Sequence, residues 1–203
     1  MKKMLNEIIS YLPVLPVALV TSIGKENKPN IITVGAVASM SQEPHVVGVG
    51  IYPFRHSYDL IEETKDFAVN FPTWRLLWET DLIGSGLSGK KVNNFEPTGL
   101  TPLKATKIKS PLIKECPVNL ECVLRQKLVL GGSKSHTWFI GDVVATHVDE
   151  EVLNEKGKID LKKAPVFIYD AWNWTYWSIG KKLEADGFSR KTSNPKLKIK
   201  ADR

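Results

Sequence analysis

The chain has 203 residues, of which 42% are hydrophobic and 25% are charged, proportions typical of a globular domain. A domain of this length buries a substantial core without disulfide or metal staples. The net charge is +6, but eight basic and only three acidic residues lie from Lys181 onward, and the remainder is nearly neutral. We therefore expect one domain over residues 1–180 and a basic, partly flexible extension over 181–203, and no nucleic-acid partner.

The start of the chain resembles a signal peptide only in part. Two lysines precede an uncharged stretch, residues 8–24, but Pro13 and Pro16 interrupt it and no small-residue cleavage site follows. A short stretch with two prolines is also a poor membrane span. We expect a helix over Met1–Leu12, whose apolar residues recur at helical spacing, and no membrane association.

Two cysteines, Cys116 and Cys122, are the only ones in the chain. They have no second pair and no nearby histidines, so a zinc or iron–sulfur site would lack ligands, and we predict no metal. Two reduced thiols are typical of a cytoplasmic protein, and this is the location we expect.

In the first half, apolar runs predict strands at residues 17–22, 30–37, 46–52 and 67–71. Gly24 to Asn27 has the composition of a hairpin turn. Helices are expected over 58–64, with Ser57 as the N-cap, over 74–83, and over a short segment at 90–95.

The second half is rich in β-forming sequence. Long strands are predicted at 117–130 and 137–148, joined by a Gly-Gly-Ser turn, while 167–170 and 175–179 are a final strand pair or loop segments. Two long antiparallel strands favour a barrel, so we expect a mainly β fold with flanking helices. Trp172, Trp174 and Trp177 are interpreted as core or dimer-interface anchors.

Two neighbouring motifs suggest a phosphorylated, planar ligand. Arg55, His56 and Ser57 place a guanidinium, an imidazole and a hydroxyl at the start of a predicted helix, which favours an anion. Upstream, the small residues of 35–39 allow close approach of a flat group to the backbone. Hydroxyls at Thr33, Ser39 and Ser41 are either ordinary sheet-surface groups or partners for the polar edge of a heteroaromatic ring.

A glycine-rich loop, residues 84–91, nearly matches the phosphate-binding loop of nucleotide triphosphatases. Lys91 stands where that loop needs a hydroxyl for magnesium, and the preceding residues read as helix rather than strand. We reject the triphosphatase interpretation. Ser88 and Lys90 remain as weaker phosphate candidates.

His136 follows the predicted turn and begins the returning strand. A lone histidine is more often structural or simply exposed, although a turn beside a strand end is also where substrate-facing groups occur. No hydrolase-type triad or carboxylate pair is indicated.

In order and spacing, these pieces resemble the flavin reductase-like family, in particular its flavoredoxin and ferric reductase branch. The similar segments cover most of residues 12–180 and are 16–21, 30–33, 38–39, Pro44, 55–57, 66–70, 120–122 and 136–143.

The resemblance implies an FMN-binding split β-barrel, with a Greek-key-like arrangement, that works as a homodimer. It places residues 35–39 along the isoalloxazine ring, Arg55, His56 and Ser57 at the phosphate, and His136 near the site where nicotinamide meets the flavin. The candidate cofactor contacts are Thr33, Gly35, Ala36, Val37, Ala38, Ser39, Tyr52, Arg55, His56, Ser57, Ser88 and Lys90.

The expected activity is hydride transfer from NAD(P)H to bound FMN and electron delivery to flavin, ferric or protein acceptors. The alternative is an FMN electron carrier, without catalysis of its own, that a partner protein reduces.

Overall fold

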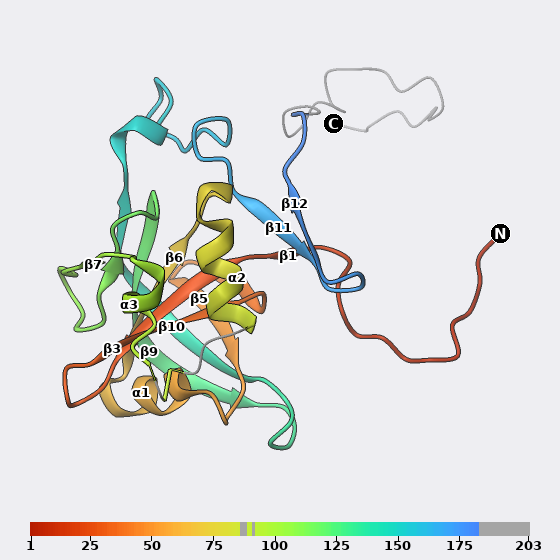
Figure 1. The fold of residues 1–203 in the computed structure, drawn as a ribbon, viewed down its shortest axis with the longest axis horizontal. Helices are drawn as coiled ribbons and strands as arrows, with labels where there is room; N and C mark the ends of the chain where they lie inside the picture. Colours follow the sequence, from red (N-terminus) through yellow and green to blue (C-terminus); the bar gives the residue numbers. More distant parts are fainter. Residues whose placement is uncertain (86–88, 91, 183–203) are drawn as a thin grey trace.

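The structure is a computed structural model that describes residues 1–85, 89–90 and 92–182. Most of these residues form one body, from which two segments project (Figure 1). One is the N-terminal arm, residues 1–14, and the other is a hairpin near the end of the described chain.

The body is built on a seven-stranded sheet whose neighbouring strands run antiparallel. The strand order is β3-β2-β6-β9-β10-β5-β4. The strands are β2 (Ala18–Ile23), β3 (Pro29–Val34), β4 (Val37–Gln42), β5 (His45–Ile51), β6 (Asp66–Phe71), β9 (Val118–Val129) and β10 (Thr137–Val148). Because β3 and β4 lie at opposite ends of this order but are consecutive in the chain, the sheet curls back on itself as a split barrel. The mainly β prediction is confirmed.

The two longest strands, β9 and β10, lie at the centre of the sheet and join its two halves. Their register shifts at two places, one between Ile140 and Gly141. A Cβ at Gly141 would lie 2.8 Å from the buried ring of Phe67, so this position requires a glycine for close packing across the sheet.

Helices and small sheets surround the seven strands. The helices are α1 (His56–Thr64), α2 (Leu77–Ser85) and α3 (Phe95–Thr98), with 3-10 turns at Trp74–Leu76 and Glu150–Val152. A three-stranded sheet joins β1 (Leu15–Pro16) to the hairpin of β11 (Phe167–Asp170) and β12 (Thr175–Ser178). A two-stranded sheet pairs β7 (Pro102–Leu103) with β8 (Leu112–Ile113).

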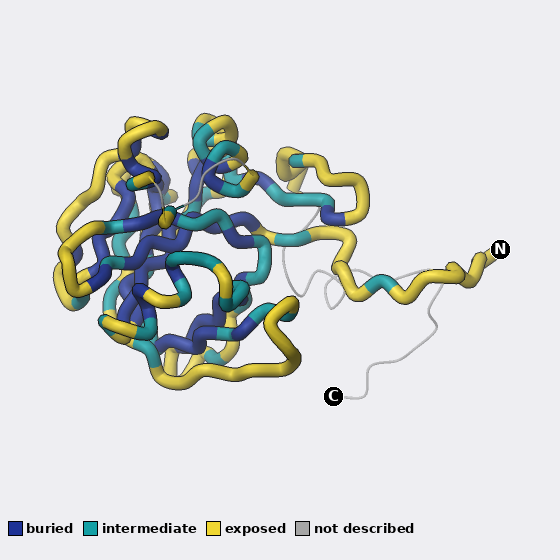
Figure 2. The backbone as a smooth tube through the Cα atoms, turned by 60° about the horizontal axis from the view of Figure 1, so that its bottom comes forward, coloured by how far each residue is buried: buried dark blue, intermediate teal, exposed yellow. Residues whose placement is uncertain are grey.

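Buried residues run through the strands of the body (Figure 2). One cluster lies inside the curl and includes Phe67 and Phe139. A second packs α2 and α3 against the opposite face of β2 and β3, around Ile31 and Phe95. The helix α2 is thereby fixed on β3.

One loop is held by a buried carboxylate. Glu121 on β9 accepts hydrogen bonds from the backbone N–H groups of Thr106, Lys107 and Ile108, from the Thr106 hydroxyl, and from Nε2 of His147 at 2.6 Å. Burial alone would raise the pKa of Glu121, but these bonds outweigh it and lower the pKa to about 2.

Four sequence-based expectations of local structure are wrong. Met1–Leu12 is not helical, because its apolar residues are exposed and have no surface to pack on. The predicted strand over 30–37 is divided into β3 and β4 by a bend at residues 35–36. The third short helix is Phe95–Thr98 rather than 90–95. The first helix begins at His56, so that Arg55 is its N-cap residue, and Ser57 lies inside the helix.

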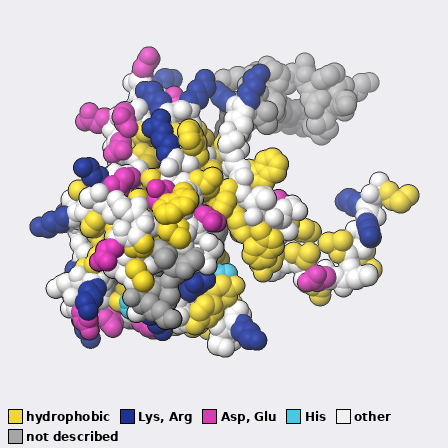
Figure 3. Space-filling model, in the orientation of Figure 1, with side chains coloured by type: hydrophobic (Ala, Val, Ile, Leu, Met, Phe, Trp, Pro, Cys, Tyr) yellow, Lys and Arg dark blue, Asp and Glu magenta, His cyan; other side chains and the backbone are white. Residues whose placement is uncertain are grey.

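The region after residue 165 also differs in part from expectation. The segments 167–170 and 175–178 do form a strand pair. Trp172, Trp174 and Trp177 are exposed rather than core residues, and hydrophobic side chains gather on this hairpin and on the N-terminal arm (Figure 3). The basic extension lies outside the described residues from 183 onward. Within the described part of the chain, no helix combines the length and apolarity that crossing a bilayer requires.

Candidate functional site

A small polar cavity lies between the first half of β3, the start of α1 and the turn at residues 89–90. Its volume is about 130 Å³. The residues that line it are Asn30, Ile31, Ile32, Phe54, Arg55, His56, Ser57, Ile83, Gly89, Lys90 and Asn94. Four of the predicted phosphate contacts, namely Arg55, His56, Ser57 and Lys90, are therefore gathered here, and we call this the phosphate cavity.

The cavity is cationic at its rim. The Arg55 guanidinium lies 5.4 Å from the centre of the Phe54 ring, an arrangement that holds the side chain without neutralising it. The Lys90 ammonium is 3.7 Å from the Asp59 carboxylate in a half-exposed pair, which is weak enough to exchange for a bound anion. The first N–H groups of α1 have no carbonyl partner within the helix, so they are available to an anion. Together with the cationic side chains, they favour a phosphate in this cavity.

Two asparagines that sequence analysis missed complete the cavity. The Asn30 Nδ2 donates to the Ser57 hydroxyl at 2.9 Å, and the Asn94 Nδ2 donates to the Ile31 carbonyl at 2.8 Å. The Oδ1 atoms of both are buried and have no donor among the described residues. Orphaned buried polar atoms beside cationic groups fit a polar ligand.

A second, larger cavity of about 350 Å³ lies beside the end of β3, between this strand, α2 and the β11–β12 hairpin. Its lining residues are Val17, Thr33, Gly35, Asp81, Gly84, Ser85, Tyr169, Trp174 and Tyr176. Three aromatic rings come from the β11–β12 hairpin, and the floor includes two glycines. We call it the aromatic cavity. Since a strand rises about 3.3 Å per residue, Gly35 is about 16 Å from Asn30. This distance is comparable to the length of a ligand that has a phosphate at one end and a ring at the other.

Two hydrogen bonds fix the walls of the aromatic cavity. The Thr33 hydroxyl donates to the Thr80 carbonyl at 2.7 Å, which fastens β3 to α2. The Tyr176 hydroxyl donates to Asp81 Oδ1 at 3.0 Å and connects the hairpin to α2. Burial, together with this bond to Asp81, raises the pKa of Tyr176, so its phenol stays neutral.

His136 packs against an aromatic ring rather than lying alone. Its ring centre is 3.9 Å from that of Tyr52, which in turn stacks on Phe54 at 5.2 Å. Gly50 separates His136 from Ala36: a Cβ at position 50 would lie 2.8 Å from the Ala36 Cβ and 3.4 Å from the His136 Cβ. Burial lowers the pKa of His136, so the imidazole is neutral at pH 7. The predicted residues Ala36, Tyr52 and His136 are thus brought together.

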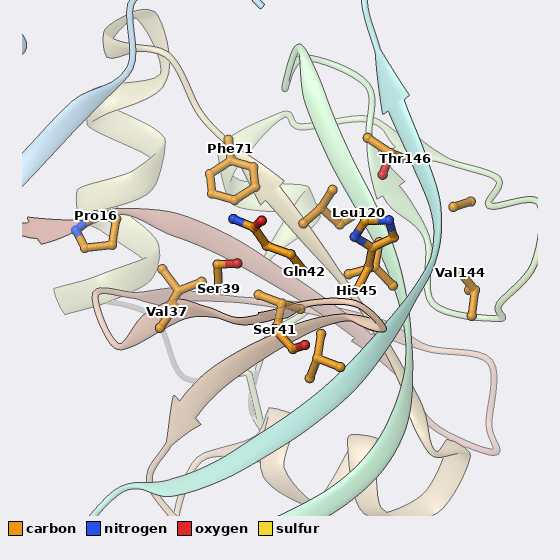
Figure 4. A pocket seen from close by; sticks show the side chains of 15 residues that line it. Pro16, Val37, Ser39, Ser41, Gln42, His45, Phe71, Leu120, Val144 and Thr146 are labelled. Carbon is orange, nitrogen blue, oxygen red and sulfur yellow. The ribbon is translucent and has the colours of Figure 1, made fainter. Parts of the chain in front are cut away.

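The remaining predicted residues, Val37, Ala38 and Ser39, line a different pocket. It has a volume of about 520 Å³ and opens between β4 and β10, with Phe71 and Leu120 in its wall (Figure 4). The small-residue run therefore does not form one continuous floor. Gly35 borders the aromatic cavity, whereas residues 37–39 line this third pocket. Between them, Ala36 contacts Gly50 on β5. Ser88 lies outside the described residues.

The missed residues carry weak sequence signals. Asn30 and Asn94 are ordinary polar residues at the ends of predicted elements, and only the fold brings them within one cavity. Asp81 and Trp174 belong to segments that are far apart in the chain. The one usable signal was the density of polar residues at 93–94, directly after the glycine-rich loop.

Comparisons with known proteins agree with this architecture. The profile of the flavin reductase like domain matches residues 14–169. An uncharacterized protein of Archaeoglobus fulgidus is 35% identical over 159 residues, which cover 78% of this chain and 86% of that protein. The chain belongs to the flavin reductase-like family.

Two solved structures are similar over nearly the whole chain. Flavoredoxin of Desulfovibrio vulgaris (Miyazaki F) superimposes with a TM-score of 0.85 at 26% identity, covering 95% of this chain and 100% of that one. Flavoredoxin from Methanosarcina acetivorans gives a TM-score of 0.81 at 29% identity, with coverage of 94% and 97%. The predicted family and split-barrel fold are therefore confirmed.

Proposed function

We propose that this protein is an FMN-dependent oxidoreductase that uses NAD(P)H as the hydride donor. The observation that carries the proposal is the pair of cavities along β3, the cationic phosphate cavity beside its first half and the aromatic cavity beside its end. The similarity to flavoredoxins and the flavin reductase like domain supports the choice of flavin.

The residues of the two cavities would bind different parts of FMN. Arg55 and Lys90 provide charge for the phosphate, with His56 and Ser57 beside them. Thr33 and Gly35 border the space for the ring, and Trp174 offers it an aromatic surface. Neutral His136 packs against Tyr52 near Ala36 and would exclude water there. When bound, FMN supplies the redox chemistry: hydride accepted from NAD(P)H and electrons passed to flavin, ferric or protein acceptors.

Anaerobic titration of the FMN-loaded protein tests this proposal. We expect NADH or NADPH to bleach the flavin absorbance at about 450 nm without any other protein. A purified protein that has no yellow colour and takes up no FMN would refute the proposal.

The similarity to two flavoredoxins favours one alternative, a carrier that receives electrons from a protein donor. In that case the same titration leaves the flavin oxidised with NADH or NADPH alone. Bleaching then requires a reduced partner protein.

The protein is also proposed to act as a homodimer in the cytoplasm. The exposed tryptophans on the β11–β12 hairpin support a protein–protein contact beside the aromatic cavity.

A further inference from the structure

Two amide oxygens of the phosphate cavity have no hydrogen-bond donor among the described residues. They restrict the chemistry of the ligand more closely than the positive charge of the cavity does. Asn30 and Asn94 are more than nine-tenths buried, and their Oδ1 atoms have no donor among the described residues. Leaving a buried acceptor unpaired is unfavourable, because the atom has lost its hydrogen bond to water. A bound ligand that supplies donors would remove that cost.

The orientation of the Asn94 amide is fixed by its neighbour. Its Nδ2 donates to the Ile31 carbonyl, and a carbonyl can only accept. Rotating the amide by half a turn would bring two acceptors face to face. Asn94 therefore presents an acceptor, and it requires a donor from the ligand.

The Asn30 amide has a more adaptable partner. Its Nδ2 donates to the Ser57 hydroxyl, which can donate as well as accept. Asn30 can rotate by half a turn, accept from Ser57 and direct its NH₂ group to an anion. The two asparagines are thus not equivalent, and only Asn94 is committed to accepting.

A phosphate dianion cannot satisfy Asn94, because it has no hydrogen to donate. We propose that Asn94 accepts a hydrogen bond from a hydroxyl of a phosphorylated polyol, while Asn30 rotates and donates to its phosphate. Asn94 would then be a specificity residue that distinguishes a hydroxylated chain from a bare phosphate ester. This inference deepens the proposed function and rests on it, since the ribityl phosphate of FMN belongs to this chemical class.

Access to the Asn30 amide involves the turn at Gly89 and Lys90. A Cβ at position 89 would lie 2.4 Å from Asn30 Oδ1, so the backbone of the turn rests directly on this amide. Outward displacement of the Gly89–Lys90 turn would expose the Asn30 amide to the ligand. The half-exposed pair of Lys90 with Asp59 is the weak contact that would be given up.

Two small ligands of equal chain length test the proposal on the unmodified full chain. Ribitol 5-phosphate carries hydroxyls, and pentyl phosphate has the same charge without them. In calorimetric titrations we expect ribitol 5-phosphate to bind at least about 10-fold more tightly, because a buried acceptor rejects a ligand that leaves it unpaired. Equal affinities would overturn the proposal.

Asn94→Ala and the neighbouring Asn93→Ala form a matched pair of variants. Asn93 does not line the cavity, and its Oδ1 accepts from the N–H of Phe95. We expect Asn94→Ala to abolish the preference for ribitol 5-phosphate and to leave pentyl phosphate affinity within about 2-fold. Asn93→Ala should retain the preference. An equal loss of both ligands in Asn94→Ala would indicate a structural role and overturn the proposal.

The same titrations separate this inference from the flavin proposal. If the chain prefers ribitol 5-phosphate but takes up no FMN, the polyol inference stands and the flavin function fails. If it takes up FMN but shows no preference between the two small ligands, the flavin function stands and the role of Asn94 is rejected.

Discussion

The Glu121 carboxylate is completely buried and holds the loop at residues 106–108 by accepting their N–H groups. Its pKa is about 2 in the folded protein, against about 4.5 when unfolded. As the pH falls from about 4.5 to about 2, the unfolded chain takes up a proton at this residue and the folded protein does not. Folding is therefore stabilised above this window and loses the contribution within it.

We expect this residue to contribute about 3 kcal/mol to the pH dependence of the free energy of unfolding. Urea denaturation at pH 7, 4.5 and 3 measures the effect. Glu121→Gln removes the titrating group. The unfolding free energy of this variant should be lower than that of the original protein at pH 7 and should decline less steeply as the pH falls. Parallel pH profiles for the two proteins would contradict the assignment.

Arg55 is the residue whose loss should most directly weaken phosphate binding. Replacing it with alanine removes one charge-assisted contact, and we expect a loss of about 1.5–3 kcal/mol in FMN affinity. Quenching of flavin fluorescence measures the dissociation constant. Arg125→Ala is the control, because Arg125 pairs with Asp142 on the β9–β10 strands and does not line the cavity. Unchanged affinity in Arg55→Ala would reject the role.

Only part of the phosphate cavity could be predicted from the sequence. Arg55, His56 and Ser57 are consecutive and precede a helix, so their placement in one cavity follows from local structure. Asn30 and Asn94 are more than sixty residues apart in the sequence, and their convergence depends on packing α3 against β3. No local pattern encodes that contact.

At the scale of elements, close packing around Gly141 controls the centre of the sheet. A methyl group there would lie 2.8 Å from the Phe67 ring and 3.1 Å from the Cys122 Cβ, both fully buried. We expect Gly141→Ala to lower the free energy of unfolding by about 1–3 kcal/mol, measured by chemical denaturation.

Gly132→Ala is the matched control for that variant. Gly132 lies in the turn between β9 and β10, and a Cβ there would meet nothing within 4 Å. Its unfolding free energy should stay within about 0.5 kcal/mol of the original protein. Equal losses in the two variants would show that crowding at Phe67 is not the cause.

The elements that sequence analysis predicted best have a buried face. The strands β2, β5, β6, β9 and β10 lie within a residue or two of the predicted ranges, since their apolar patterns reflect burial in the sheet. Met1–Leu12 has an equally regular apolar stripe, but an isolated helix of this length is marginal without packing. The division between β3 and β4 was missed because both sides of the bend favour extended structure.

For the whole molecule, the exposed tryptophans indicate where a second copy would bind. Trp172, Trp174 and Trp177 lie on the β11–β12 hairpin, outside the core. We expect a dimer in sedimentation velocity experiments, and Trp177→Asp should raise its dissociation constant at least about 10-fold. Trp78→Asp, an equally exposed change on α2, should leave the dimer intact. A monomer at micromolar concentration would contradict the expectation.

The order of the strands in the sheet could not be predicted from the sequence. A barrel was predicted from the long strands, and its confirmation rests on the pairing of distant segments. For example, Val49 pairs with Phe139, and Ala68 pairs with Glu121. Such pairs depend on the complementarity of surfaces rather than on the composition of either strand.

The central position of the β9–β10 hairpin has a consequence for folding kinetics. Its strands are joined by a short turn, so their pairing closes a small loop, whereas β5 and β6 join the sheet across long stretches of chain. We expect this central hairpin to act as the template to which the two flanks, each with a local hairpin of its own (β2–β3 and β4–β5), are added from opposite sides. Substitutions within the hairpin should therefore slow folding, while those in the outer strands β3 and β4 should mainly accelerate unfolding.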